Sequence, residues 1–356
     1  MTPREVVTRA IEFRRPERLP VNGYGEASDV TWLVHDEVKP PEAQGNDLVD
    51  QWLCRWEKTA QPNMGQVKGH PLEDLSRMKD FPWPDGNDPR RYANVTKHLA
   101  DLAADPNRRD KYVSAGIFMI LWERMHSLHG FENCMMDLMD DAPAIHELAD
   151  RILEYDIAVV RQMYRAAGGR IQGFSFTEDW GTELDVHLAP DLWRKFFFPR
   201  YQKLFGVIHE CGWHVWMHSC GKINRFIPGL IEAGVDVLNM QQPRTNGIDE
   251  VGRLFAGRIC FETLCDIQKT LPAGNRAEIL AEAEHLLGAW GTRDGGFILG
   301  DYGDHVAIGA APEIKDFMFQ AFRRLDPYKK KGTKGPAAAN HVFGLGTNVP
   351  PRQRFR

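Results

Sequence analysis

Residues 213–240 read WHVWMHSCGKINRFIPGLIEAGVDVLNM, and this stretch decides the fold. Residues 213–218 form an apolar run that predicts a buried strand, and residues 235–240 predict a second one. The segment between them, 223–233, has a helical pattern. A strand, a helix and a strand in this order indicate two neighbouring parallel strands.

The same alternation extends to both sides of this stretch. Further strands are expected at 112–119, 171–176, 258–261 and 296–299, and helices at about 120–138, 142–168, 191–211, 249–255, 276–290 and 312–324. No GxGxxG or GxxxxGK turn is present. Repeated strand–helix units without such a turn favour an α/β fold of the (β/α)8 TIM barrel type over a nucleotide-binding sheet.

The two ends of the chain differ from this regular part. Residues 2–14 predict a helix with Thr2 as its cap, and residues 19–21 lead to a possible end of a first strand. Residues 60–110 are rich in proline and aspartate and predict an irregular excursion with a helix near 91–105. We therefore expect one barrel over residues 1–328 and a flexible tail over 329–356.

Composition excludes several classes of protein. The 356 residues are 43% hydrophobic and 26% charged, with a net charge of −5, which gives no general attraction to nucleic acid or to an anionic membrane. No run of 18 apolar residues predicts a membrane span, and the amino end has no signal-peptide core, so a cytoplasmic location is expected. The six cysteines are widely spaced, which favours free thiols over a disulfide framework.

Polar side chains follow five of the expected strands. In a barrel the chemistry lies at the carboxyl ends of the strands, so these residues are candidates for one shared site. They are Glu178, Asp179 and Trp180 after 171–176, His218 and Cys220 after 213–218, Asn239 and Gln241 after 235–240, Glu262 and Cys265 after 258–261, and Asp301 and Tyr302 after 296–299.

His218 and Cys220 are the candidate metal ligands. Strand side chains alternate between faces, so these two residues point the same way. An imidazole and a thiolate together suit a soft divalent ion such as zinc. Cys265 is the candidate third ligand. The simpler interpretation is that His218 is a buried histidine and that each thiol is a small buried hydrophobe.

The remaining candidates divide by chemistry. Glu178, Asp179 and Asp301 are candidate catalytic acids, although Glu178 and Asp179 also suit a cap of the next helix or a solvated loop. Candidate contacts with a substrate come from aromatic and amide side chains, of which the tryptophans suit core packing equally well. These candidates are Trp122, Trp180, Tyr302, Asn239 and Gln241.

Several of these segments together resemble the uroporphyrinogen decarboxylase superfamily, which includes cobalamin-dependent methyltransferases. The resemblance spans roughly residues 2–325. It is carried by Thr2-Pro3-Arg4-Glu5, by the run from Phe13 to Val21, by Glu178-Asp179-Trp180-Gly181-Thr182, by Pro199-Arg200-Tyr201, by His218-Ser219-Cys220-Gly221, by the run from Leu230 to Asn239, and by Gly295-Gly296-Phe297-Ile298-Leu299. The resemblance implies a single (β/α)8 barrel with a central cleft.

The methyltransferase branch implies a zinc site built from a His-x-Cys pair and a later cysteine. His218 and Cys220 match the pair, but Gly300-Asp301-Tyr302-Gly303-Asp304 stands where the later cysteine is expected. Either Cys265 or a carboxylate such as Glu178 replaces it, or no zinc is bound. The decarboxylase branch implies an arginine-rich amino-terminal signature, which is missing here, so porphyrinogen decarboxylation is disfavoured.

The leading hypothesis is a zinc-dependent transfer of a methyl group between a small methylated compound, such as a methyl ether, and a separate corrinoid protein. The corrinoid would be held by that partner, because the chain has no Asp-x-His-x-x-Gly pattern. A metal-free decarboxylase or lyase of a small acid, and a non-catalytic binding protein, are the alternatives. A homodimer is common in the superfamily and is possible here.

Overall fold

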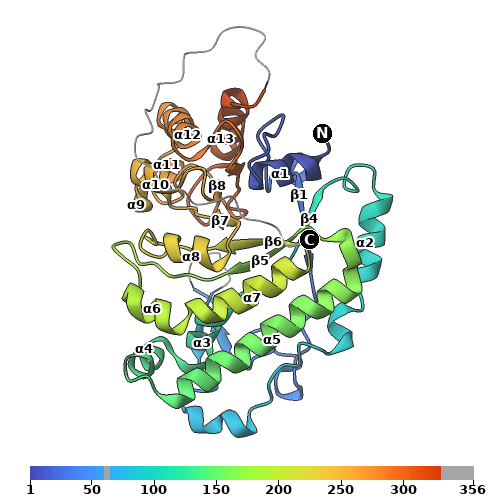
Figure 1. Ribbon diagram of the computed structural model, residues 1–356, viewed down its shortest axis with the longest axis vertical. Helices are drawn as coiled ribbons and strands as arrows, with labels where there is room; N and C mark the ends of the chain where they lie inside the picture. The colour runs from blue at the N-terminus through green and yellow to red at the C-terminus, as the bar shows by residue number, and fades with distance from the viewer. Residues whose placement is uncertain (60–64, 330–356) are drawn as a thin grey trace.

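The computed structural model describes residues 1–59 and 65–329, and its centre is a curled sheet of seven parallel strands (Figure 1). The strands are paired in the order β1-β4-β5-β6-β7-β8-β9, so each strand after β1 pairs with the next one along the chain. They are β1 (Val30–Val34), β4 (Tyr112–Gly116), β5 (Gly173–Thr177), β6 (His214–His218), β7 (Val237–Asn239), β8 (Cys260–Thr263) and β9 (Phe297–Leu299). The expected α/β class with a parallel sheet is confirmed.

The expected eight-stranded closed barrel is not confirmed in the described residues. The segment before β1 contributes one bridged residue, Val21, which pairs in parallel with Leu299 of β9. Leu299 donates a backbone hydrogen bond to the Pro20 carbonyl (2.9 Å) and accepts one from Asn22 (2.8 Å). Pro20 has no N–H to donate to a neighbouring strand, which helps to explain why this segment is so short.

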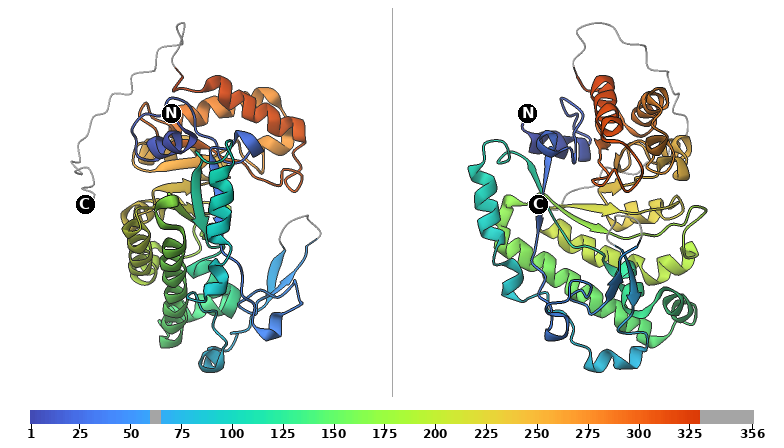
Figure 2. Two further views of the ribbon diagram at one scale, coloured as in Figure 1. Left: turned by 90° about the vertical axis from the view of Figure 1, so that its right-hand side faces the viewer. Right: turned by 180° about the vertical axis from the view of Figure 1, so that it is seen from behind.

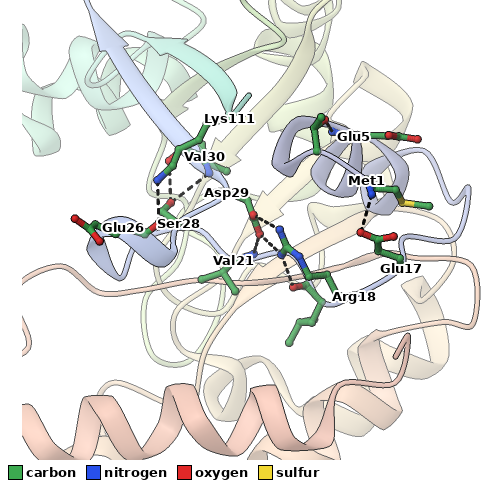
Figure 3. A network of polar contacts seen from close by, with 12 residues as sticks. Met1, Glu5, Glu17, Arg18, Val21, Glu26, Ser28, Asp29, Val30 and Lys111 are labelled. Carbon is green, nitrogen blue, oxygen red and sulfur yellow. Dashed lines mark hydrogen bonds and ion pairs between the residues drawn. The ribbon is translucent and has the colours of Figure 1, made fainter. Parts of the chain in front are cut away.

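Asp29 ties this segment to the opposite edge of the sheet. Its carboxylate accepts hydrogen bonds from the Arg18 guanidinium (2.7 and 2.5 Å) and from the Val21 backbone (2.9 Å), as Figure 3 shows. Its backbone N–H donates to the Val21 carbonyl (2.7 Å), one residue before β1 begins. The bonds of Val21 and Asp29 therefore link β9 to the start of β1.

Helices cover the outside of the sheet. In Figure 1, α5 and α7 run side by side along one flank, and α12 and α13 lie together near the other end of the sheet. The helices are α1 (Pro3–Ile11), α2 (Val95–Ala104), α3 (Leu121–His129), α4 (Phe131–Met139), α5 (Pro143–Ala167), α6 (Pro190–Phe196), α7 (Phe198–Glu210), α8 (Ile227–Ala233), α9 (Pro243–Asn246), α10 (Ile248–Phe255), α11 (Thr270–Ala273), α12 (Arg276–Trp290) and α13 (Pro312–Leu325).

The concave side of the sheet is apolar at its amino end. Val7 and Ile11 of α1 pack there in one buried cluster with residues of six strands. These are Val30, Tyr112, Trp216, Val237, Cys260 and Ile298. Because strand side chains alternate, the next inward positions toward the carboxyl end include polar residues on four of these strands, which are Ser114, His218, Asn239 and Glu262. The concave side of the sheet is therefore packed with apolar side chains at the amino ends of the strands and is polar toward their carboxyl ends.

Several predicted elements differ in detail. The predicted helix at 120–138 is broken at Gly130, whose φ is +90°, and the one at 191–211 is interrupted at Phe197. Elements that were missed include β1, the short helices α9 and α11, and a hairpin of β2 (Arg55–Glu57) and β3 (Gln66–Gly69), which projects from the body in Figure 2. From residue 330 onward the predicted flexible tail lies outside the described residues.

Candidate metal centre

The loops after β5 and β6 run side by side and bring three donor side chains together. The Glu178 N–H donates to the His218 carbonyl (3.0 Å), and the Gly181 N–H donates to the Cys220 carbonyl (3.2 Å). Strand pairing thus continues past the ends of both strands. Asp179, between the two bonded positions, lies beside His218 and Cys220 as a result.

Two glycines allow this close approach. Gly221 has a φ of +77°, and a Cβ placed on it would lie 2.1 Å from the Gly181 carbonyl oxygen. A Cβ on Gly181 would lie 2.5 Å from the Lys222 nitrogen. Any larger residue at either position would force the two loops apart.

The donor atoms of Asp179, His218 and Cys220 all lie within 4.8 Å of one another. His218 Nε2 is 3.2 Å from Cys220 Sγ and 3.6 Å from Asp179 Oδ1. The same carboxylate oxygen accepts a hydrogen bond from the Cys220 backbone (2.7 Å). Burial, and then the charge of Asp179, raise the pKa of the Cys220 thiol, as expected for a buried thiol beside acids.

Glu178 has a different place from the one predicted for a ligand or catalytic acid. Its carboxylate is fully buried and accepts hydrogen bonds from the backbone of Trp122 (2.7 Å) and Glu123 (2.9 Å) in the first turn of α3. The Tyr201 hydroxyl also donates to it (2.5 Å). Burial raises the pKa of Glu178 to about 8, and these three donors oppose the rise. Glu178 therefore caps α3, which precedes it in the chain, whereas its sequence position suggested a cap of the next helix or a solvated loop.

Cys265 is not part of the donor group. Its side chain is completely buried, and its thiol donates to the Ile279 carbonyl of α12 (3.5 Å). Of the three predicted ligands, the structure brings His218 and Cys220 together but not Cys265, and Asp179 lies beside the His-x-Cys pair instead. Along β8 the side chains of Cys260 and Glu262 point to the inner face of the sheet. Side chains alternate between faces, so Cys265, an odd number of positions further on, points toward the outer helices.

The other predicted catalytic acid, Asp301, is engaged elsewhere. It forms an ion pair with Lys315 of α13 (2.6 Å), and its side chain is only 10% exposed. Tyr302 is half-buried, and the pKa of its phenol is raised by burial and then by Cys220, which places it within electrostatic range of the donor group. Gln241 is half-buried on the segment after β7.

The two tryptophans predicted to contact a substrate are core residues. Trp122 and Trp180 have no exposed surface, and their rings stack on each other at 5.1 Å. Asn239 is 7% exposed, and its side chain contacts His218 instead of open space.

Glu123 is a residue of the site that sequence reasoning missed. It is 7% exposed, and its Oε2 atom has no hydrogen-bond partner. Burial, followed by the charges of Asp179 and Glu178, raises the pKa of Glu123 to about 8. The available signal was its position, because it is the first acid after the expected strand at 112–119.

Comparison with known proteins places the chain in a family. The family model named Uroporphyrinogen decarboxylase (URO-D) matches residues 115–325, which is more than half of the chain. The chain belongs to the uroporphyrinogen decarboxylase family. Members of the family are enzymes, either decarboxylases or related methyltransferases. The matched region runs from β4 to the end of α13 and contains Asp179, His218 and Cys220.

Other comparisons add little to the family assignment. No curated protein matches the chain. Among solved structures, native xylanase 10B from Thermotoga maritima matches with a TM-score of 0.39 and 12% identity, covering 91% of this chain and 100% of that one. Within the described residues, no helix has the length and apolar character needed to cross a membrane.

Proposed function

We propose that this member of the family is a zinc-dependent methyltransferase, which moves a methyl group between a small methylated compound and a separate corrinoid protein. The observation that carries the proposal is the convergence of Asp179, His218 and Cys220 at the carboxyl ends of β5 and β6. In a parallel α/β fold this is the end at which active sites lie.

The donor set fits zinc in kind and in number. A carboxylate, an imidazole and a thiolate are ordinary zinc ligands, with bonds of about 2.0–2.3 Å, and three protein ligands leave the fourth position open. The side chains of His218 and Asp179 are 21% and 39% exposed, so this position is accessible from solvent. Zinc bound here would act as a Lewis acid on the oxygen or sulfur of a methylated compound.

The residues around the donors supply the remaining chemistry. Cys220 must release its proton when a cation binds, and Asp179 next to it must stay ionised. Glu123 can hold a proton at neutral pH, because its pKa is raised to about 8. A leaving alkoxide or phenoxide needs such a proton, so Glu123 is the proposed general acid.

The charge around the site argues against the family's namesake substrate. Asp179 and Glu183 both act on Cys220 as negative charges. A tetrapyrrole with many carboxylates would need cationic partners instead. A neutral methyl ether or thioether suits these surroundings better.

The proposal is tested by methyl transfer to reduced cobalamin, used as a substitute for the corrinoid protein. The purified protein, loaded with zinc, is incubated with a panel of aryl and alkyl methyl ethers, and methylcobalt is followed by its absorbance. We expect methylcobalt with at least one ether, loss of the signal in Cys220→Ser, and its retention in Cys265→Ser. Absence of methylcobalt with cobalamin and with candidate corrinoid proteins alike, or release of carbon dioxide from small acids instead, would refute the proposal.

A further inference from the structure

A row of polar side chains lies behind His218 on the inner face of the sheet. His218 of β6 is in register with Asn239 of β7, which is in register with Glu262 of β8. In-register residues of parallel strands point to the same face, so these three side chains are neighbours. The row is almost closed to solvent, since Asn239 is 7% exposed and Glu262 only 3%.

Glu262 is held as a hydrogen-bond acceptor. The indole N–H of Trp216 donates to its Oε2 atom (2.7 Å), and the Asn22 amide donates to its Oε1 atom (2.7 Å). An indole N–H can only donate, so it needs an acceptor at this place. The side chain of Asn239 also forms a hydrogen bond with Glu262. Burial raises the pKa of the Glu262 carboxyl group, and the hydrogen bonds of Asn22, Trp216 and Asn239 oppose the rise, as N–H groups donated to a carboxylate do.

The orientation of Asn239 then determines which nitrogen of His218 carries the proton. With its NH2 group turned to Glu262, Asn239 presents its Oδ1 atom to His218 Nδ1, at 2.5 Å. A carbonyl oxygen can only accept, so Nδ1 must be the protonated nitrogen of the neutral ring. The lone pair is then on Nε2, the atom that faces Cys220 and Asp179.

We propose that Glu262 and Asn239 are positioning residues, which fix His218 in the tautomer whose Nε2 atom is free to bind a cation. The functional meaning of this free nitrogen rests on the metal site proposed above, but the tautomer itself does not. Partners of this kind commonly orient metal-binding histidines, and their loss typically weakens metal affinity by about 10- to 100-fold.

The tautomer can be measured without any metal. Protein labelled with 15N-histidine is studied as the apo form at a pH of about 8, where an ordinary imidazole is neutral, by long-range 1H–15N correlation. His218 is assigned through His218→Gln. We expect the Nδ1–H tautomer in the wild type, its loss in Asn239→Leu, and its retention in Asn239→Asp, which keeps an acceptor beside Nδ1. An Nε2–H ring in the wild type, or an unchanged ring in Asn239→Leu, overturns the proposal.

A second readout separates positioning from general destabilisation. Gln51→Leu is the matched control, because Gln51 is an equally buried amide that is bonded to Tyr155 in a separate network. Both leucine variants should unfold at lower temperature, but only Asn239→Leu should weaken Co2+ binding, by about 10-fold or more. Equal Co2+ affinity in Asn239→Leu and wild type counts against the positioning role. If the wild type has the expected tautomer and binds no Co2+, the metal proposal fails while the tautomer assignment stands.

Discussion

Glu123 has one carboxylate oxygen without a partner in a site that is otherwise well hydrogen-bonded. It lies in the first turn of α3, where its own backbone N–H is capped by Glu178. The two neighbouring acids thus differ in their surroundings: Glu178 caps the helix, and Glu123 lies within electrostatic range of Asp179 and Cys220. Different surroundings separate the roles of paired acids in this way at many active sites.

The role of Glu123 predicts a pH dependence. With its pKa raised to about 8, the proton is present below that pH and is lost as the pH rises through it. Zinc bound to Asp179 would lower this pKa, so demethylation of an ether should decline as the pH rises toward about 8. Glu123→Gln should lower the rate by about 100-fold or more and abolish this decline, with zinc content unchanged. A full rate in Glu123→Gln, measured by methylcobalt formation, would show that the proton comes from elsewhere.

At this scale only part of the site could be predicted from the sequence. The pairing of His218 with Cys220 follows from strand alternation, because both lie on one short stretch. The place of Asp179 as the third donor does not follow from strand alternation. Asp179 lies beside His218 and Cys220 only because two loops that are distant in sequence pair with each other. Cys265 was predicted as a ligand because its thiol has the right chemistry. The structure does not bring it to the site, because the alternation of side chains along β8 turns it away from the inner face.

At the scale of elements, the approach of the loops after β5 and β6 depends on Gly221. Gly221→Ala would place a methyl group 2.1 Å from the Gly181 carbonyl at a φ of +77°. We expect loss of zinc binding and a stability loss larger than the cost of the left-handed backbone alone, which is about 1–2 kcal/mol. Urea unfolding and metal analysis of the purified variant measure both effects.

Gly212 supplies a control for this prediction. Its φ of +76° is nearly the same, but a methyl group added to it would have no other atom within 4 Å among the described residues. Gly212→Ala should therefore lose only the stability that the left-handed backbone costs a residue with a side chain, and it should retain zinc. If the two variants lose equal stability and both keep zinc, the close approach of the loops is not what organises the site.

The elements themselves were predicted unevenly, for physical reasons. Helix α12 was predicted with its observed ends, because its pattern is long and Asn275 caps it through the Ala277 and Glu278 backbones. Strand β1 was missed, since Trp32 and Val34 are exposed and the segment lacks the pattern of a buried strand. The break at Gly130 depends on a positive φ that helical periodicity does not reveal.

At the scale of the whole molecule, Asp29 connects the two edges of the sheet. Asp29→Asn should weaken the bonds to Arg18 and Val21 and lower the free energy of unfolding by about 2–3 kcal/mol. Glu17→Gln is the control, because the pair of Glu17 with the Met1 amino group is exposed (Figure 3) and should leave the unfolding midpoint unchanged. Equal midpoints for Asp29→Asn and wild type would contradict a role in joining the edges.

The proposed function depends on one claim, that Asp179, His218 and Cys220 bind a metal ion. The most direct test is the zinc content of tag-free wild type, Cys220→Ser, Asp179→Asn and Cys265→Ser, measured by plasma mass spectrometry. We expect about one zinc per chain in the wild type and in Cys265→Ser, none in Cys220→Ser, and a clear decrease in Asp179→Asn. The claim would be contradicted by a wild type that binds no zinc even when zinc is supplied. It would also be contradicted if Cys265→Ser lost its zinc while Asp179→Asn kept it.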